Sequence, residues 1–398
     1  MNILQVCLKP PYPKVDGGCM AMAAITESLL LGKHEVKCLT MATHKHPFRL
    51  EKVPQKIQDE TKIESVQIDT KIKPLDALIN LFGSASYNIE RFESEEFEAK
   101  LISILAADDY DTIILESLFC TPYIASIRKV STAKIIVRAH NVEFQIWEAL
   151  ALGQSSFLKK QYLGLLARRM KAYEIKALNN VDGILCITEE DKRELEQLGV
   201  NTPIDVQPIG MNISALQYKT PKIGAANLYH VGAMDWEPNI EGVNWFVDDI
   251  WPLLTERFPT LKCHLAGRKM PDYLIQQSTE NLVVQGEVDS VKAFTEDKNV
   301  AIVPLLSGSG LRVKIVEALA LGKVVITTSV GAMGIPYSDG QNMLIANSPE
   351  EFVAQIEKLI QKPILVQEIS NSARKLAESE FDLHNLSTKL TYFCQQKS

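Results

Sequence analysis

The sequence has few of the features that mark membrane-spanning, secreted or nucleic-acid-binding proteins. No apolar run approaches the roughly 20 residues that a helix needs to cross a bilayer. The opening residues, MNILQVCL, have no basic stretch before their apolar run, which favours a β-strand over a secretion signal. A formal net charge of -7 argues against a general nucleic-acid binder, which is usually basic. We therefore expect a cytoplasmic protein that binds no nucleic acid.

Cysteines with the spacing of a metal site or a redox pair are also missing. All seven occur singly, and several fall within runs typical of strands. The expected result is buried free thiols in a reducing compartment. The seven are Cys7, Cys19, Cys38, Cys120, Cys186, Cys263 and Cys394.

The length of 398 residues exceeds the size at which a single core keeps growing, so two domains are expected. Short β-branched runs alternate with helical segments in both halves, which predicts parallel sheets covered by helices on both faces. In the first half these runs are residues 2–8, 34–41, 111–117, 134–140 and 183–188. In the second half they are residues 227–233, 261–267, 282–288, 300–306, 324–329 and 343–347.

The alternation predicts an α/β protein with two doubly wound Rossmann-like domains, residues 1–206 and 207–379. The boundary lies close to a polar stretch with proline and small-residue turns. Residues 50–98 show the least pattern and are left as loops and helices. Because doubly wound sheets bind ligands at the carboxyl ends of their strands, a site is expected at those ends.

The clearest candidate site lies in residues 303–328, VPLLSGSGLRVKIVEALALGKVVITT. The pattern predicts a strand, a glycine-rich loop, a helix that begins at Leu311, and a second strand. Arg312 and Lys314 fall in the first turn of this helix, where exposed N–H groups already make the site positive. A cation there costs a few tenths of a kcal/mol, up to about 1. A bound diphosphate would reverse that cost, because both cations would become its ligands.

A simpler explanation exists for part of this pattern. Lys314 and Glu317 are three residues apart and could form an ordinary surface ion pair. That pair would leave Arg312 and the glycines unexplained, whereas a diphosphate accounts for all of them. Glu317 could then accept hydrogen bonds from a ribose diol.

Three other strand ends in the second half carry polar or glycine-rich turns. Arg268 follows one strand and a glycine, and Val288 ends a short GEV turn whose main chain could hold a planar base. Residues 232–239, GAMDWEPN, could provide acceptor contacts or could simply be a capped turn.

In the first half, candidate binding residues follow two of the expected strands. Gly17 and Gly18 open a helix after the first strand and would let the backbone approach an anion, although turn glycines at such places are common. The stretch RAHNVEF groups His140, Asn141 and Glu143 at another strand end. A histidine there can bind sugar hydroxyls or shuttle a proton. The alternative is a cluster that caps the next helix.

With these motifs the chain resembles the retaining, nucleotide-sugar-dependent glycosyltransferases called GT-B, and in particular the group-one glycosyl transferases of family four. The motif over residues 308–335 is the most specific, and the others are individually weak. The motifs that carry the resemblance are PPYPKVDGG (10–18), RAHNVEF (138–144), CITEEDKRELEQLG (186–199), VQPIGMN (206–212), GRKMP (267–271) and GSGLRVKIVEALALGKVVITTSVGAMGI (308–335).

The resemblance implies two Rossmann-like domains that face a central cleft, with a C-terminal helix, about residues 380–398, that crosses back to the first domain. It implies catalytic roles for His140, Arg312 and Lys314. The implied donor-binding residues are Gly17, Gly18, Arg268, Val288, Gly308, Ser309, Gly310, Leu311 and Glu317. The implied acceptor-binding residues are Asp16, Asn141 and Glu143.

The resemblance also implies the chemistry. A sugar would pass from a nucleotide-diphosphate sugar to a hydroxyl of a carbohydrate or lipid-linked acceptor, with retention and with no protein nucleophile. No metal or other cofactor is expected, because basic side chains and helix N-termini neutralise the leaving diphosphate. By family analogy the acceptor belongs to a bacterial surface polysaccharide or glycolipid.

The chain departs from the family pattern at two places. Many relatives have a glutamate where this chain has Ser309, and a cationic pair where it has residues 232–239. Arg268, Arg312 and Lys314 are expected to supply the missing positive charge. Two rival functions remain, a nucleotide-sugar 2-epimerase of the same fold and a non-catalytic nucleotide-sugar-binding partner.

One basic amphipathic segment, residues 157–178, also bears on partners. It could contact the inner face of an anionic membrane that carries a lipid-linked sugar. The alternative is a core-facing helix with a solvated basic face.

Overall fold

A computed structural model describes residues 1–71, 80, 86–216, 218, 226–308 and 310–396. The chain divides into two compact units. Unit 1 comprises Met1–Met211 and Leu383–Ser398, and unit 2 comprises Asn212–Asp382. The division lies beyond the boundary expected at residues 206 and 207, because the loop after the last strand of unit 1 still packs in that unit. There the Leu383 N–H donates to the carbonyl oxygen of Met211 over 3.0 Å.

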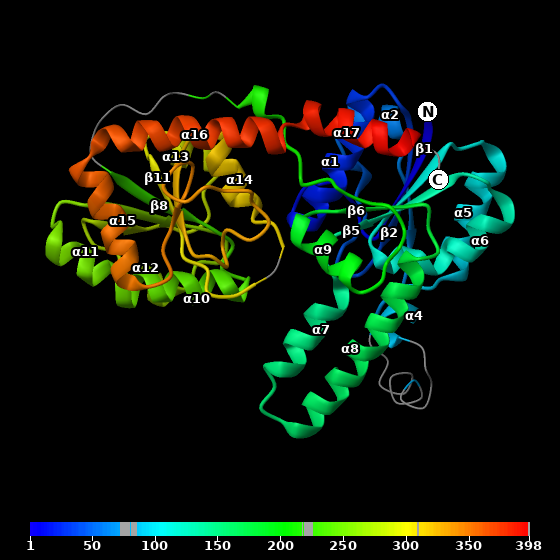
Figure 1. Cartoon of the computed structure of the whole chain (residues 1–398), viewed down its shortest axis with the longest axis horizontal. Helices are drawn as coiled ribbons and strands as arrows, with labels where there is room; N and C mark the ends of the chain where they lie inside the picture. The colour runs from blue at the N-terminus through cyan, green and yellow to red at the C-terminus, as the bar shows by residue number, and fades with distance from the viewer. Residues whose placement is uncertain (72–79, 81–85, 217, 219–225, 309, 397–398) are drawn as a thin grey trace. The chain divides into compact units, whose positions relative to one another are not determined.

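Unit 1 is built on a parallel sheet (Figure 1). Within the described residues the sheet has seven strands in the order β3-β2-β1-β4-β5-β6-β7. The strands are β1 (Asn2–Cys7), β2 (Glu35–Ala42), β3 (Glu64–Gln67), β4 (Thr112–Glu116), β5 (Lys134–Ala139), β6 (Gly183–Cys186) and β7 (Ile204–Val206). The helices are α1 (Gly17–Leu31), α2 (Gln55–Thr61), α4 (Tyr87–Glu90), α5 (Glu95–Ala107), α6 (Ile124–Val130), α7 (Glu143–Leu152), α8 (Phe157–Leu178), α9 (Glu189–Gln197) and α17 (Leu383–Gln395).

Unit 2 repeats the arrangement. The part of it that the structure describes has a six-stranded parallel sheet in the order β10-β9-β8-β11-β12-β13. The strands are β8 (Asn227–Val231), β9 (Lys262–Ala266), β10 (Leu282–Val284), β11 (Val300–Val303), β12 (Val324–Thr327) and β13 (Leu344–Ile345). The helices are α10 (Glu237–Trp245), α11 (Trp251–Arg257), α12 (Asp272–Ile275), α13 (Val291–Thr295), α14 (Val313–Ala320), α15 (Pro349–Gln361) and α16 (Pro363–Phe381).

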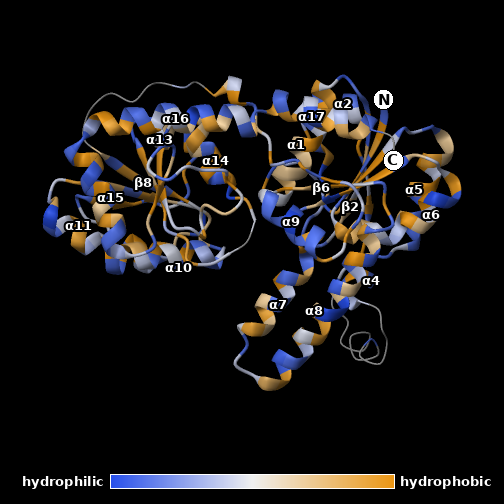
Figure 2. Ribbon diagram, viewed as in Figure 1, coloured by the Kyte–Doolittle hydropathy of each residue, from blue (hydrophilic) through white to orange (hydrophobic). Residues whose placement is uncertain are grey.

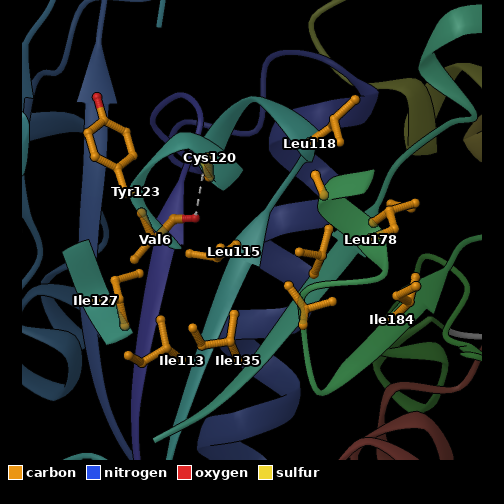
Figure 3. Close-up of a cluster of buried hydrophobic side chains, with 14 of the residues drawn as sticks. Val6, Ile113, Leu115, Leu118, Cys120, Tyr123, Ile127, Ile135, Leu178 and Ile184 are labelled. Atoms are coloured by element: carbon orange, nitrogen blue, oxygen red, sulfur yellow. Dashed lines mark hydrogen bonds between the residues drawn. The ribbon is translucent and has the colours of Figure 1, made fainter. Parts of the chain in front are cut away.

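The strands carry the core because helices cover both faces of each sheet. In unit 1, Val6, Ile113, Leu115 and Ile135 are fully buried on neighbouring strands (Figure 3). Figure 2 shows the same apolar strands between helices that turn hydrophilic faces outward. The thiol of Cys120 packs in this core and donates to the Val6 carbonyl oxygen over 3.7 Å. All seven cysteines are free and buried, as predicted.

The C-terminal helix α17 belongs to unit 1, as expected. The Ser387 hydroxyl donates to the Ser28 carbonyl oxygen at 2.5 Å, and the Gln207 side chain donates to the Leu386 carbonyl oxygen at 3.1 Å. Leu390 is buried against α1 and the sheet. The return of the chain end to the first unit therefore rests on both packing and hydrogen bonds.

Two details differ from the sequence expectations. Residues 50–98 contain strand β3, which was missed because only Val66 in it is buried, so no alternation marks it. Helix α14 begins at Val313 rather than Leu311, and Arg312 occupies the N-cap position in an extended conformation.

Across the described residues, no helix is both long and apolar enough to span a bilayer.

Candidate functional site

Loops at the carboxyl ends of the unit 2 strands are tied together by their backbones. The Gly232 N–H donates to the Ala266 carbonyl oxygen at 3.1 Å, and the Met234 N–H donates to that of Arg268 at 2.8 Å. The Gly267 N–H in turn donates to Gly286 at 3.1 Å. A Cβ on Gly267 would lie 1.7 Å from the Gly232 carbonyl oxygen, so the two loops approach closely only because this residue is glycine.

Two cations meet at this end of the sheet. Cζ of Arg312 lies 5.3 Å from the centroid of the Trp236 ring, and Nζ of Lys314 lies 6.0 Å from it. The Lys314 ammonium donates to Oδ1 of Asn239 at 2.5 Å, and the Asn239 amide donates to the Ala233 carbonyl oxygen at 2.7 Å. Trp236 at the N-cap of α10 therefore lies near both cations, and Asn239 in the first turn of α10 binds Lys314. The acceptor contacts considered for residues 232–239 stay a prediction.

Burial and neighbouring like charge act on the ionisable groups of this cluster. Burial, and then the charge of Arg312, lower the pKa of Lys314 to about 7. Burial also lowers the pKa of Arg312 to about 10 and raises that of Glu317 above its ordinary value. Within the described part of the chain no ion pair joins Lys314 to Glu317, so the simple surface pair considered above is not formed. Two crowded positive groups at a helix N-terminus are an arrangement that a bound anion would stabilise, and the predicted anion site there stays a prediction.

The loop that precedes α14 is shaped by glycine. Gly308 and Gly310 have φ values of 112° and 78°, which residues with a side chain rarely adopt. A Cβ on Gly308 would lie 2.8 Å from a guanidinium nitrogen of Arg312, so the arginine lies against the loop. Leu311 is partly exposed, and Ser309 lies outside the described residues.

His230 is a further polar group at this site that sequence reasoning missed. Its Nδ1 lies 2.8 Å from the Ile302 carbonyl oxygen, so Nδ1 carries the proton, and burial lowers the pKa of the imidazole to about 3. Its Nε2 is buried and, among the described residues, has no hydrogen-bond partner. The ring therefore keeps a neutral acceptor beside Gly232.

Arg268 and Val288 lie at other strand ends of the same unit. Arg268 donates to both carboxylate oxygens of Asp235 at 3.1 and 3.2 Å, so its charge is matched locally. Val288 is partly buried in the loop after β10. Whether either residue contacts a donor stays a prediction.

In unit 1, His140 joins a buried polar cluster. Its Nε2 lies 2.9 Å from Oε2 of Glu116, and Gln5 donates to the other carboxylate oxygen at 2.8 Å. Arg138 is fully buried with its Nε 3.7 Å from the same carboxylate, and burial lowers the pKa of its guanidinium. No nitrogen of this guanidinium has a hydrogen-bond partner in the described chain. Glu116 is thus the shared acid of the cluster, and no sequence motif had marked it.

Asn141 and Glu143 lie at the start of α7 beside a second acid. Glu174 of α8 accepts hydrogen bonds from the N–H groups of Glu143 and Phe144 at 3.0 and 3.1 Å. Burial, and then the charge of Glu174, raise the pKa of Glu143 to about 8. Glu143 is therefore a buried, largely protonated group, and the acceptor role expected of it stays a prediction.

The loop after β1 contains the remaining predicted residues. Asp16 caps α1 by accepting from the Cys19 N–H at 2.8 Å, and Lys9 donates to its carboxylate at 2.7 Å. Burial alone would raise the pKa of Asp16, but these hydrogen bonds lower it to about 2. Gly17 faces open space, whereas a Cβ on Gly18 would lie 2.9 Å from the end of the Lys9 side chain.

A cavity of about 210 Å³ adjoins this loop. Its lining includes the cationic side chains of Lys45, Arg49 and Lys52, together with His46, whose pKa burial lowers. An acceptor at the loop would therefore meet positive charge.

Within unit 1 the structure groups His140 with Asn141, and within unit 2 it groups Arg312 and Lys314 with the Gly308 loop.

Comparisons with known proteins agree with this architecture. The chain matches the family described as "Glycosyl transferases group 1" over residues 225–362 and the family described as "Glycosyltransferase Family 4" over residues 83–215. An uncharacterized 44.6 kDa protein in the cps region of Klebsiella pneumoniae is 23% identical in an alignment of 395 positions that covers 96% of each chain.

Solved structures with the same fold confirm the two-domain prediction. A sucrose-phosphate synthase from Thermosynechococcus elongatus matches with a TM-score of 0.71 and 13% identity, over 99% of this chain and 98% of its own. HepE of Anabaena in complex with UDP matches with a TM-score of 0.69 and 13% identity, over 99% of both chains. HepE in complex with UDP-glucose matches with a TM-score of 0.65 and 12% identity, also over 99% of both.

Proposed function

Since the chain belongs to the group 1 glycosyl transferases and is a glycosyltransferase, we propose that it transfers a sugar from a nucleoside-diphosphate sugar to a hydroxyl acceptor with retention. Unit 2 binds the donor, and unit 1 binds the acceptor. The reaction needs no metal ion, because protein cations neutralise the diphosphate.

The observation that carries the proposal is the pairing of Arg312 and Lys314 at the start of α14. The Lys314 ammonium is held by a neutral amide, and the pKa of Lys314 falls to about 7 through burial and the neighbouring guanidinium. A bound diphosphate would stabilise the positive charge of Lys314, because the anion brings an opposite charge that the neutral amide of Asn239 does not. The main chain of Gly308, Gly310 and Leu311 would face the same group, and the donor role predicted for Ser309 lies outside the described residues.

The proposed chemistry follows from this charge. The bond between the anomeric carbon and the diphosphate breaks, while the acceptor oxygen attacks the same face of the sugar. The acceptor proton passes to the departing phosphate oxygen, so no protein nucleophile is required. Arg312 and Lys314 stabilise the negative charge that grows on the diphosphate, which is the larger part of catalysis in such a site.

The other predicted residues take supporting roles in the proposal. Glu317 binds the ribose diol, and Val288 offers main-chain groups to the base. Arg268 breaks its ion pair with Asp235 and binds the donor instead. Gly17 and Gly18 keep the donor-binding role predicted for them. His140 binds a hydroxyl of the transferred sugar, and Asp16, Asn141 and Glu143 serve the acceptor side.

We further propose a bacterial surface polysaccharide or glycolipid as the product, with peripheral contact at the inner face of the membrane. Support comes from the relative in a cps region, and from the basic cavity beside the loop after β1. UDP-glucose is the first donor to test, because HepE is described in complex with it.

The test is a screen of nucleotide sugars by thermal shift, followed by an assay of nucleotide release. A true donor raises the melting temperature because it binds only the folded protein. Arg312→Ala and Lys314→Met are expected to weaken binding at least about tenfold each, on the scale of a charge-assisted contact. The matched controls are Arg257→Ala and Lys292→Met, which change exposed cations of the same unit. Unchanged affinity in both site variants, or epimerisation of the donor without transfer, would refute the proposal.

A further inference from the structure

The α7–α8 hairpin of unit 1 exposes a group of large apolar side chains at its far end. Among the described residues, the three most exposed large apolar side chains are Leu158 at 80%, Leu152 at 72% and Phe157 at 71%. Leu150, at 47%, lies beside them in sequence. A single exposed leucine is ordinary, but four large apolar side chains exposed around one short turn are not, and they are here named the apolar tip.

The base of the hairpin is firmly built, which makes the tip a projecting feature. Met170 and Leu178 of α8 are buried in the core of unit 1, and Glu174 binds the first N–H groups of α7. The 22 residues of α8 span about 33 Å at the usual helical rise. Figure 1 shows both helices running together away from the sheet, and Figure 2 shows apolar residues at their far end.

The charge of the hairpin is opposite to that of the chain. Residues 143–178 contain six basic and three acidic residues, a formal charge of +3, whereas the whole chain carries -7. Two of those acids, Glu143 and Glu174, are buried, which leaves Glu148 as the exposed one. Lys159 and Lys160 are exposed and directly follow the apolar tip.

We propose that this hairpin docks the protein on an anionic lipid bilayer. The apolar tip enters the boundary between headgroups and acyl chains, and Lys159 and Lys160 contact anionic headgroups. An apolar end followed directly by two exposed lysines is complementary to such a surface, whereas four side chains offer far less than the roughly 1,000 Å² of a stable protein interface. This proposal identifies the apolar tip as the surface that would make the membrane contact proposed above, and it rests on the proposed function.

Vesicle flotation of the full chain tests the docking directly. The wild type is expected to float with vesicles of equal parts phosphatidylglycerol and phosphatidylcholine, and much less with phosphatidylcholine alone. The triple variant Leu152→Ser, Phe157→Ser, Leu158→Ser is expected to lose at least about tenfold in partitioning, since each apolar side chain contributes to burial. The double variant Lys159→Glu, Lys160→Glu is expected to lose the preference for anionic vesicles.

The matched control is the double variant Lys389→Glu, Tyr392→Ser, which changes one exposed cation and one exposed aromatic of α17. It is expected to float like the wild type. A second readout uses the fact that all seven native cysteines are buried. A fluorophore on Leu158→Cys is expected to shift to the blue on anionic vesicles, whereas one on Tyr392→Cys is not.

Three results would overturn the docking proposal. The wild type could fail to float, the tip variants could float as well as the wild type, or sedimentation could show a dimer that the triple variant abolishes. The last result would assign the tip to a second copy of the chain. Nucleotide-sugar affinity, measured in parallel, separates this test from the proposed function, because the tip variants are expected to bind donor like the wild type.

Discussion

Nε2 of His140 lies 2.9 Å from Oε2 of Glu116, on the same carboxylate that faces the buried guanidinium of Arg138. One acid on β4 thus serves the fully buried Arg138 of β5 and the partly exposed His140 that follows this strand. The carboxylate orients the imidazole and compensates the guanidinium. These two roles lead to separate predictions, one for stability and one for turnover.

The stability prediction concerns Glu116 and Arg138. Glu116→Gln is expected to lower the free energy of unfolding of unit 1 by about 3–5 kcal/mol, because it leaves a buried guanidinium without its acid. Adding Arg138→Met is expected to cost less than the two single changes combined, by more than about 1 kcal/mol. Hydrogen exchange of peptides from β4 and β5 in urea measures the free energy of unfolding of unit 1 separately from that of unit 2. Strictly additive losses would contradict the ion pair.

The turnover prediction concerns Glu116 as a positioning residue for His140. His140→Ala is expected to reduce kcat of nucleotide-sugar hydrolysis or transfer by about 100-fold, with little change in KM for the donor. Glu116→Gln is expected to reduce kcat by about tenfold, because the imidazole loses its orienting partner. The double variant should then be no slower than His140→Ala alone. Multiplicative losses would show that Glu116 acts independently of the histidine.

The pH dependence of donor binding follows from Lys314. Burial and Arg312 hold its pKa at about 7 in the ligand-free protein, and a bound diphosphate would raise that pKa. Binding above pH 7 must therefore take up a proton, so the Kd is expected to rise by up to about tenfold per pH unit above 7. A nucleotide sugar is the right probe because it has no terminal phosphate that titrates. Lys314→Met should abolish the slope and Lys292→Met should keep it, whereas an equal slope in both would exclude Lys314.

Glu143 is expected to make unit 1 less stable as the pH rises. Burial, and then the charge of Glu174, raise the pKa of Glu143 from 4.5 to about 8 in the folded chain. Its contribution is fully present below pH 4.5 and is lost as the pH rises through 8, at roughly 1 kcal/mol per pH unit. Glu143→Gln stays neutral, so its advantage over the wild type should grow from pH 5 to pH 8. Glu148→Gln, on the exposed face of α7, is the control and should follow the wild type in urea titrations at each pH.

How far the sequence predicts this structure depends on the range of the interactions. The inner strands were predictable because burial on both faces leaves unbroken β-branched runs, as in β5 and β12. The sequence also singled out Arg312 and Lys314, because they stand at a helix N-terminus after a glycine-rich loop, and His140, because it follows a strand; their roles stay predictions. Their partners were not identified, because Glu116 lies 24 positions from His140 and Asn239 lies 75 positions from Lys314. Only the folded sheet brings such residues together; no local motif marks Glu116, and the motif over residues 232–239 does not reveal that Asn239 pairs with Lys314.

The close approach of the unit 2 loops gives the last prediction. Gly267→Ala would place a methyl group 1.7 Å from the Gly232 carbonyl oxygen, and a backbone clash of this kind is expected to cost about 3 kcal/mol or more. Gly286→Ala meets nothing within 4 Å and should cost less than about 0.5 kcal/mol. Neither glycine has a positive φ, so the two variants differ in contact and not in backbone strain. Because the Gly232 loop leads to Trp236 and Asn239, Gly267→Ala should also weaken donor binding, whereas Gly286→Ala should not. Equal stability of the two variants in thermal unfolding would mean that the loops are not held together as the structure has them.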